Sequence, residues 1–179
     1  GIGQNPARQA GLKAGGPDTL NAVTINKVCG SGLQAVMQAS QSIRAGDNSL
    51  VVAGGMENMS ASPHLASVRG GLKFGAGQLV DHMEHDGLTC AFEGWGMGSA
   101  AEWIAETFDV SRDDQDAFAA ASHQKAAAAT REGRFANEIT TVSAADAKQK
   151  ADVDADEGIR GDSSADGLAK LRPVFAREG

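Results

Sequence analysis

The sequence predicts an α/β fold, and three consecutive segments carry that prediction. Residues 22–26 are short and rich in β-branched side chains, which favours a strand. Residues 33–43 place apolar side chains at helical spacing. Residues 50–53 are apolar without interruption, as in a strand that is buried on both faces. A strand, a helix and a strand in this order predict a βαβ unit with parallel strands and a right-handed crossover.

Glycines mark both ends of the predicted helix. The sequence Cys29-Gly30-Ser31-Gly32 ends the first strand, and the helical pattern starts at Leu33. Gly46 follows the pattern, where a residue in the left-handed conformation commonly terminates a helix. We therefore expect a tight strand-to-helix turn at Cys29, with the glycines on its C-terminal side allowing the chain to turn.

The sequence changes character after the βαβ unit. Residues 60–98 contain several glycines, Pro63 and three histidines without a sustained period, so we expect a long irregular segment. Residues 99–108 and 111–133 each predict a helix, and the second begins with the capping box Ser111-Arg112-Asp113-Asp114. Residues 138–142 predict one more strand.

Composition excludes several classes of function. The 179 residues carry 16 Lys and Arg against 23 Asp and Glu, for a net charge of −7, and aromatic residues make up only 4%. This acidic balance and the scarcity of stacking side chains argue against a nucleic-acid partner. No apolar run approaches the ~18–20 residues of a membrane span, so no membrane partner is expected. Two cysteines make no disulfide framework, which favours a reducing cytoplasm.

Cys29 is the residue best placed to carry chemistry. A helix that begins just after it directs unpaired N–H groups and the positive end of the helix dipole at the sulfur, which favours the thiolate. The same N–H groups could stabilise an oxyanion on an attacked carbonyl. This arrangement predicts a nucleophile elbow with cysteine as the nucleophile. A small buried core thiol fits the spacing equally well.

Several long motifs in this sequence resemble those of the thiolases, in particular the biosynthetic acetyl-CoA acetyltransferases. The longest reads NKVCGSGLQAV and surrounds Cys29. The resemblance runs in register from Gly1 to Gly179, so it covers the whole chain. The matching segments are residues 3–10, 26–36, 52–60, 69–71, 86–89, 97–98, 111–118 and 169–173.

The resemblance implies the layered αβαβα thiolase fold, with residues 1–58 as part of the N-terminal catalytic domain and 59–179 as the loop domain that binds CoA. It implies that Cys29 carries the acyl group as a thioester, while its N–H contributes to the oxyanion hole. Leu88 and Met97 match positions that line the pantetheine tunnel, and Arg160 matches the arginine at the nucleotide end of CoA. Residues 63–79 match the loop through which such enzymes form homotetramers.

The implied reaction is the Claisen condensation of two acetyl-CoA to acetoacetyl-CoA, and the reverse thiolysis. The CoA thioester is the substrate, and neither a cofactor nor a metal is implied. Such an enzyme acts in lipid metabolism. Two positions depart from the pattern, because Gly96 and Gly167 stand where the family has a polar residue and a serine. These departures weaken the expected polar contacts to the pantetheine and near the adenine.

The larger departure concerns the catalytic partners of Cys29. Thiolases need a histidine that activates the nucleophile and a second cysteine that removes a proton from the second acyl-CoA. Both belong to the C-terminal half of the family, and none of the four histidines here matches the first. Since the chain also begins at Gly1, we expect an internal part of a longer chain that is inactive alone. The alternative is a truncated, inactive module that binds CoA or a partner subunit.

Other candidate sites are weaker. His82 and His85 have the spacing of two metal ligands on one helix face, but no motif supplies a third ligand. Asp152, Asp154 and Asp156 alternate as in an EF-hand, yet the required glycine and glutamate are missing, so a solvated acidic turn is expected. Cys90 is expected to be a structural thiol, and His64 and His123 are expected to be surface or loop residues.

Overall fold

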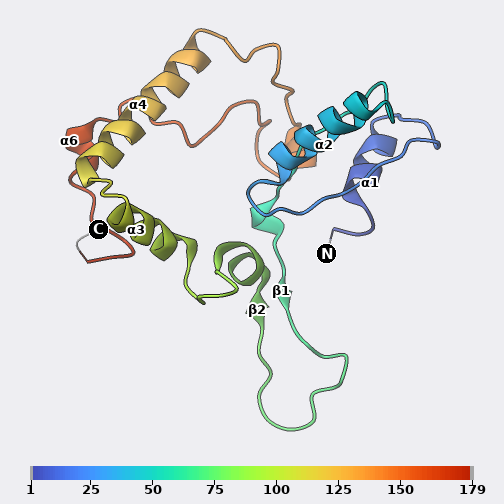
Figure 1. The fold of residues 1–179 in the computed structure, drawn as a ribbon, viewed down its shortest axis with the longest axis horizontal. Helices are drawn as coiled ribbons and strands as arrows, with labels where there is room; N and C mark the ends of the chain where they lie inside the picture. The colour runs from blue at the N-terminus through green and yellow to red at the C-terminus, as the bar shows by residue number, and fades with distance from the viewer. Residues whose placement is uncertain (1, 178–179) are drawn as a thin grey trace. The chain divides into compact units, whose positions relative to one another are not determined.

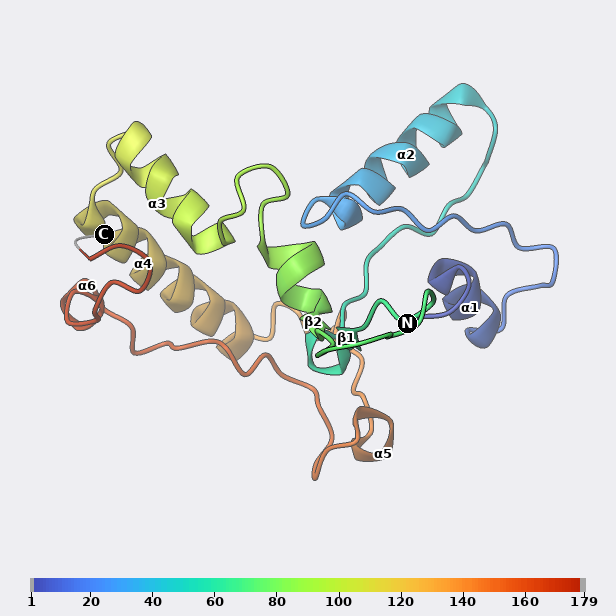
Figure 2. The same ribbon diagram turned by 90° about the horizontal axis from the view of Figure 1, so that it is seen from below.

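The computed structural model describes residues 2–177 as two compact units, of which the first ends at Gly94 and the second begins at Trp95. Gly1, Glu178 and Gly179, at the outer limits of the predicted domains, lie outside the described residues. The predicted domain boundary between residues 58 and 59 comes from the family resemblance. The contacts within the chain do not test it, so it stays a prediction. The α-helices and strands are labelled in Figure 1, apart from α5, which is labelled in Figure 2. No helix within residues 2–177 is both long enough and apolar enough to cross a membrane.

The first unit is built on two helices and one short antiparallel pair of strands. The helices are α1 (Pro6–Lys13) and α2 (Ser31–Ala45), and the strands are β1 (His64–Leu65) and β2 (Val80–Asp81). A 3₁₀ turn, η1 (Met59–Ala61), precedes β1, and a π-helix, η2 (Met83–Leu88), follows β2. Within the described residues, β1 and β2 form the only sheet, with His64 opposite Asp81 and Leu65 opposite Val80.

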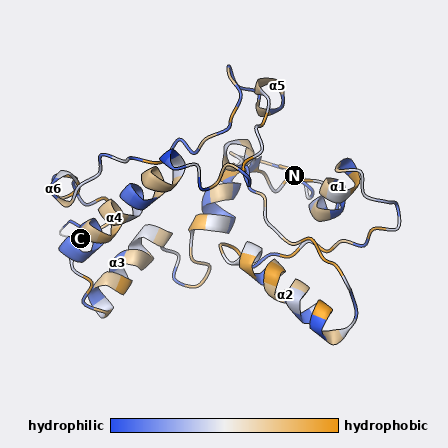
Figure 3. Cartoon of the chain, turned by 90° about the horizontal axis from the view of Figure 1, so that it is seen from above, coloured by the Kyte–Doolittle hydropathy of each residue, from blue (hydrophilic) through white to orange (hydrophobic). Residues whose placement is uncertain are grey.

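Helix α2 confirms the predicted helix. It begins at Ser31, two residues before the apolar pattern, and Gly46 ends it in the left-handed conformation with φ of 83°. Apolar residues recur along this helix as predicted, and the ribbon of α2 carries orange, hydrophobic segments in Figure 3. Leu33, Val36, Met37 and Ile43 nevertheless remain exposed. The amphipathic face is therefore present, but the described residues of this unit do not cover it.

The two strands predicted on either side of α2 are wrong for this structure, and the βαβ unit does not form. Residues 22–26 and 50–53 have no strand pairing. The Ala22 carbonyl instead accepts a hydrogen bond from the Asn5 side chain at 2.9 Å. Leu50 and Val52 are 82% and 95% exposed. The reason is that β-branched and apolar residues favour a strand only when a paired, packed sheet receives them.

The irregular segment predicted for residues 60–98 is confirmed in its main part. Between β1 and β2 the chain makes turns and bends without further helix or strand. The segment also contains η1, the two short strands and η2, which have too few residues to show a period in the sequence. Residues 138–142 form no strand, because only Val142 pairs, in an isolated antiparallel bridge with Val153.

The second unit is organised around its longest helix. Helices α3 (Met97–Thr107) and α4 (Arg112–Arg131) confirm the two predicted helices, and Ser111 caps α4 by accepting from the Asp114 N–H at 3.1 Å. Two single-turn helices follow, α5 (Ala144–Ala147) and α6 (Ala165–Leu168). Figures 1 and 2 both show α6 beside α4, and the two helices are in contact.

A charged pair fixes α6 against α4. The Arg112 Nε lies 3.0 Å from both carboxylate oxygens of Asp116, one turn further along α4. The same guanidinium donates through Nη2 to the carbonyls of Leu168 and Leu171, at 2.8 and 3.0 Å. Asp116 is only 8% exposed, and Ala120, one turn on, is buried as well. The centre of this unit is thus partly polar, and its two charged side chains, Arg112 and Asp116, pair with each other.

Candidate functional site

Cys29 lies on a tight turn that leads directly into α2, as the sequence predicts. The turn is closed by the Gly30 N–H, which donates to the Lys27 carbonyl at 3.0 Å. Gly30 is the N-cap of α2, and Cys29 is exposed with a free thiol. The alternative interpretation, a small thiol buried in a core, is therefore not what the structure shows.

The conformational strain of this turn falls on Val28 rather than on a glycine. Val28 has φ of 48°, in the left-handed region, whereas Gly30 has an ordinary φ of −87°. The sequence predicts that the glycines after Cys29 allow the chain to turn, but the positive φ of the turn lies before the cysteine, at Val28. A β-branched residue rarely adopts a positive φ, and such strain costs on the order of 1–3 kcal/mol unless neighbours hold it in place.

Side chains from both sides of the turn hold Val28. The Val28 N–H donates to the Asn26 Oδ1 at 2.9 Å. The Ser31 hydroxyl donates to the Val28 carbonyl at 2.7 Å and accepts from the Lys27 N–H at 2.8 Å. Each of these backbone groups would otherwise need water as a partner, because the turn belongs to no sheet.

Three backbone N–H groups around Cys29 remain free for a ligand. In the part of the chain that the structure describes, no hydrogen bond uses the N–H of Cys29, Gly32 or Leu33. Groups of this kind at the start of a helix carry partial positive charge and point away from the helix, so they favour a thiolate or an oxyanion beside them. The arrangement therefore offers the kind of donors that stabilise the oxygen of an attacked carbonyl.

A second glycine pair brings another segment close to the start of α2. A Cβ atom placed on Gly55 would lie 3.8 Å from the Gly32 Cα. The backbone after residues 50–53 thus passes directly beside the first turn of α2. Gly54 and Gly55 follow that apolar run in the sequence, and a side chain at Gly55 would meet the Gly32 backbone at an ordinary van der Waals distance.

The three predicted CoA-binding residues lie in different parts of the chain. Leu88 is the last residue of η2 in the first unit, whereas Met97 is the first residue of α3 and Arg160 lies in the loop before α6. All three side chains are exposed. Within residues 2–177, no hydrogen bond joins Leu88 to Cys29 in the first unit, or Met97 to Arg160 in the second. Their roles stay predictions.

Helix α4 holds the segment that carries Arg160. The Arg160 N–H donates to the Nδ1 of His123 at 3.2 Å, and the Gln124 Nε2 donates to the Ser163 carbonyl at 2.9 Å. A Cβ atom placed on Gly161 would lie 2.8 Å from the Ala127 Cβ, so the loop approaches the helix very closely. His123, expected to be a surface or loop residue, lies in α4 and anchors the backbone of Arg160.

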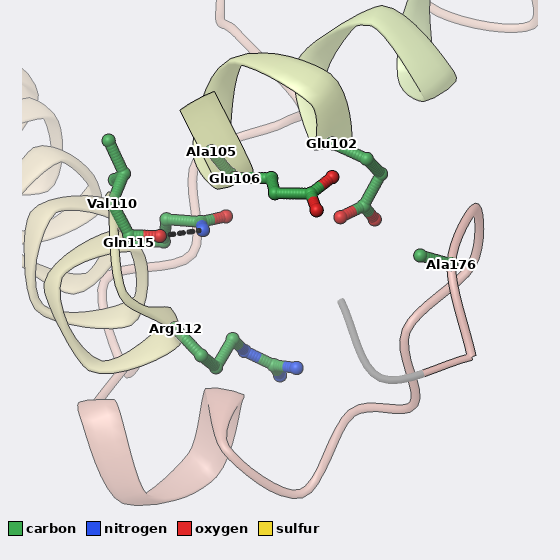
Figure 4. Close-up of a pocket in the computed structure, with 7 residues that line it drawn as sticks. All are labelled: Glu102, Ala105, Glu106, Val110, Arg112, Gln115 and Ala176. Atoms are coloured by element: carbon green, nitrogen blue, oxygen red, sulfur yellow. Dashed lines mark hydrogen bonds between the residues drawn. The ribbon is translucent and has the colours of Figure 1, made fainter. Parts of the chain in front are cut away.

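Two open pockets lie elsewhere. The one in Figure 4 has a volume of about 370 Å³ and lies between α3, the start of α4 and Ala176. Its carboxylates, Glu102 and Glu106, face Arg112 across the opening, which suits a polyanionic ligand poorly. The second, in the first unit, includes Glu84, His85 and Thr89. Neither is lined by Cys29, Leu88, Met97 or Arg160.

The two histidines with metal-ligand spacing, His82 and His85, both contact the carboxylate of Asp86. His82 Nε2 lies 3.3 Å from one carboxylate oxygen of Asp86, and His85 Nδ1 lies 2.6 Å from the other. The hydrogen bond to His85 is the largest cause that holds the pKa of Asp86 below its ordinary value, against an opposing effect of desolvation. Among residues 2–177, no group of three or more His, Cys, Asp or Glu side chains is arranged to hold a metal ion.

The acidic triplet also has a local explanation. Asp152 accepts a hydrogen bond from the Ala144 N–H at 2.7 Å, at the start of α5. This carboxylate therefore satisfies a free N–H of a helix end, which is a common use of aspartate. The solvated acidic turn expected from the sequence fits this contact better than a calcium loop does.

Comparisons with known proteins agree with the motifs. The family model of the thiolase N-terminal domain matches residues 1–179. An acetyl-CoA acetyltransferase from Shinella zoogloeoides is 51% identical over 179 residues, and one from Chromobacterium violaceum is 52% identical over 183. A probable acetyl-CoA acyltransferase from Staphylococcus aureus (strain COL) is 49% identical over 181. Each alignment covers all of this chain but 46% of the relative, so the chain spans about half their length.

Proposed function

This chain belongs to the thiolase family, whose α/β fold class the sequence predicts, and from that membership we propose that the whole protein is an acyl-CoA C-acyltransferase. Its reaction is the Claisen condensation of two acetyl-CoA to acetoacetyl-CoA, and the reverse thiolysis. The observation that supports this proposal best is the turn at Cys29, with an exposed thiol at the start of α2 beside three free N–H groups.

The first half-reaction forms an acetyl-cysteine. The Cys29 thiolate attacks the carbonyl carbon of acetyl-CoA, and the negative charge that develops on the oxygen is stabilised by the backbone N–H groups at the start of α2. The intermediate collapses with cleavage of the C–S bond to CoA, which leaves as a thiolate and takes up a proton. The CoA thioester is the only ligand that the reaction requires, and no separate cofactor takes part.

The second half-reaction forms the carbon–carbon bond. A base removes a proton from the α-carbon of a second acetyl-CoA, and the resulting carbanion attacks the acetyl carbonyl on Cys29. The C–S bond to Cys29 then breaks, which releases acetoacetyl-CoA and restores the thiolate. Within residues 2–177 no side chain hydrogen-bonds to the Cys29 sulfur. We therefore place the base in the part of the relatives' length that this chain does not span.

We place the binding of CoA on residues 59–179, the proposed loop domain, with Leu88 and Met97 along the pantetheine and Arg160 at a phosphate of the nucleotide. The exposure of all three side chains and the anchoring of Arg160 by His123 support this placement. A guanidinium suits a phosphate because it donates two parallel hydrogen bonds. The N-terminal catalytic domain then includes residues 1–58.

We also propose that the protein forms a homotetramer through residues 63–79 and works in the cytoplasm, in lipid metabolism. Large apolar side chains in or beside this loop, among them Leu72, Phe74 and Leu79, are exposed, and β1 and β2 bring the two ends of the loop together. Both cysteines are free, as in a reducing compartment. Analytical ultracentrifugation tests the assembly, and a protein that sediments as a monomer contradicts it.

The experiment that tests the function is mass spectrometry of the whole protein after brief exposure to acetyl-CoA. We expect one added acetyl group, on the peptide that contains Cys29 and not on the peptide that contains Cys90. The competing proposal is a module that binds CoA without turnover. Such a module would bind CoA but gain no acetyl group and form no acetoacetyl-CoA, and that result would rule out the enzymatic proposal.

A further inference from the structure

The Ser31 hydroxyl connects two peptide groups of the turn, the one before Lys27 and the one after Val28. It accepts from the Lys27 N–H at 2.8 Å and donates to the Val28 carbonyl at 2.7 Å. A single side chain therefore fixes the orientation of the backbone on both sides of the Lys27–Val28 segment. Ser31 is also the first residue of α2, so the same residue connects this turn to the helix.

The turn needs such a contact because its strained residue is a valine. Val28 has φ of 48°, and a β-branched residue relaxes to negative φ unless its neighbours prevent it. Neither glycine of the motif relieves this strain, because Gly30 has a negative φ and Gly32 is part of the helix. A relaxed Val28 would rotate the next peptide group and carry the Cys29 thiol away from the start of α2.

We propose that Ser31 is a positioning residue for Cys29. Its two hydrogen bonds keep Val28 in the left-handed conformation, and this conformation holds the thiol where the free N–H groups at the start of α2 stabilise its negative charge. Asn26 supports the same conformation from the other side, through the Val28 N–H. The effect on turnover rests on the proposed function, whereas the effect on thiol reactivity is a property of the turn alone.

The test compares the rates at which iodoacetamide labels Cys29 and Cys90 in the whole protein, followed by peptide mass spectrometry. Ser31→Ala should slow the labelling of Cys29 about fivefold to tenfold, because the thiolate loses its position at the helix start. Cys90 is the internal reference, and its rate should not change. Ser31→Thr keeps a hydroxyl and should restore most of the Cys29 rate. Ser40→Ala, the same change on an exposed position of α2, should have no effect on either cysteine.

Turnover supplies the second measurement. Ser31→Ala should lower kcat about tenfold, with the KM for acetyl-CoA changed less than about twofold, because the thiol and not the CoA-binding surface is displaced. Ser31→Thr should recover most of kcat. Because a loss of folded protein also lowers the apparent kcat without changing KM, kcat is expressed per active site, and the tenfold fall should remain after that correction.

Each possible result decides the proposal. Equal labelling of Cys29 in the Ser31→Ala variant and the unmodified protein overturns it, and so does a parallel change at Cys90, which would indicate general unfolding. If the unmodified protein forms no acetoacetyl-CoA but Ser31→Ala still slows Cys29 labelling, the proposed function fails and the positioning role stands. If turnover is present and Ser31→Ala changes neither measurement, the function stands and the positioning role fails.

Discussion

The turn at Cys29 and the helix α4 represent two opposite ways of placing a functional group. At the turn, residues 26–34 hydrogen-bond only to close neighbours in the sequence, and the thiol is exposed. Along α4, the contacts reach residues far away in the sequence, from His123 to Arg160 and from Arg112 to Leu168 and Leu171, around a buried carboxylate. The proposed nucleophile is therefore placed by local structure, and the proposed CoA-binding arginine is placed by tertiary structure.

The largest effect on activity should come from a change in the turn at Cys29. Cys29→Ala removes the proposed nucleophile, so formation of acetoacetyl-CoA by the whole protein should fall roughly 10³-fold or more. Steady-state kinetics measures the loss. Cys90→Ala is the matched control, because it removes a thiol outside the turn and should retain most of the activity. Comparable losses in the two variants would mean that Cys29 has no special role.

The next largest effect should be on stability, and only in the second unit. Asp116→Ala leaves the Arg112 guanidinium without its partner at a site where the carboxylate is 8% exposed, so it should cost about 2 kcal/mol locally. Hydrogen exchange followed by mass spectrometry should show faster exchange over α4 and residues 160–171, and unchanged exchange over residues 26–45.

The control for Asp116 is an exposed ion pair. Arg134 and Glu132 contact each other at 2.6 Å, but both side chains are about half or more exposed to solvent. Glu132→Gln should therefore cost less than about 1 kcal/mol. If Asp116→Ala also accelerates exchange over α2, the two regions are not independent, and the contrast between them is lost.

A smaller effect, on the KM for acetyl-CoA, should appear when alanine replaces Arg160. Arg160→Ala should raise the KM for acetyl-CoA about tenfold with little change in kcat, because one charged hydrogen-bonding group to a phosphate is lost. S-acetylpantetheine has the reactive thioester but no nucleotide, so its KM should not change. Equal increases for both substrates would place Arg160 away from the nucleotide.

The smallest effect should come from the anchor of Arg160. His123→Leu removes the Nδ1 that accepts from the Arg160 N–H, so the KM for acetyl-CoA should rise about threefold, as expected for one neutral hydrogen bond. His123→Asn places an amide oxygen close to the former Nδ1 and should restore the lower KM. If His123→Asn behaves like His123→Leu, the hydrogen bond does not position the arginine.

The helices could be predicted from the sequence because their signals are local. The apolar spacing of α2, the glycine at its end and the capping serine of α4 all lie within a few residues of the structure that they specify. The predicted strands are different, because residues 22–26 and 50–53 need neighbouring strands to pair with. Their composition favours a strand, but pairing is a property of the surrounding structure.

The candidate site divides in the same way. Cys29 could be found because a cysteine followed by two nearby glycines, just before a helix, is visible in the sequence. The strain at Val28 could not, since nothing in a valine indicates a positive φ. Ser31 was visible in the motif but gave no sign of its two hydrogen bonds. The contact from His123 joins residues 37 positions apart, a distance at which a single sequence carries no signal.

The short range of the contacts around Cys29 also has a consequence for the order of folding. The hydrogen bonds of the turn span two to seven residues, so they close small loops at a low cost in chain entropy. Contacts of this kind form fast, whereas the pairing of distant strands is slow. The thiol should therefore reach its final conformation early, while the rest of the protein is still assembling. During that interval the proposed nucleophile is already exposed to oxidants and electrophiles.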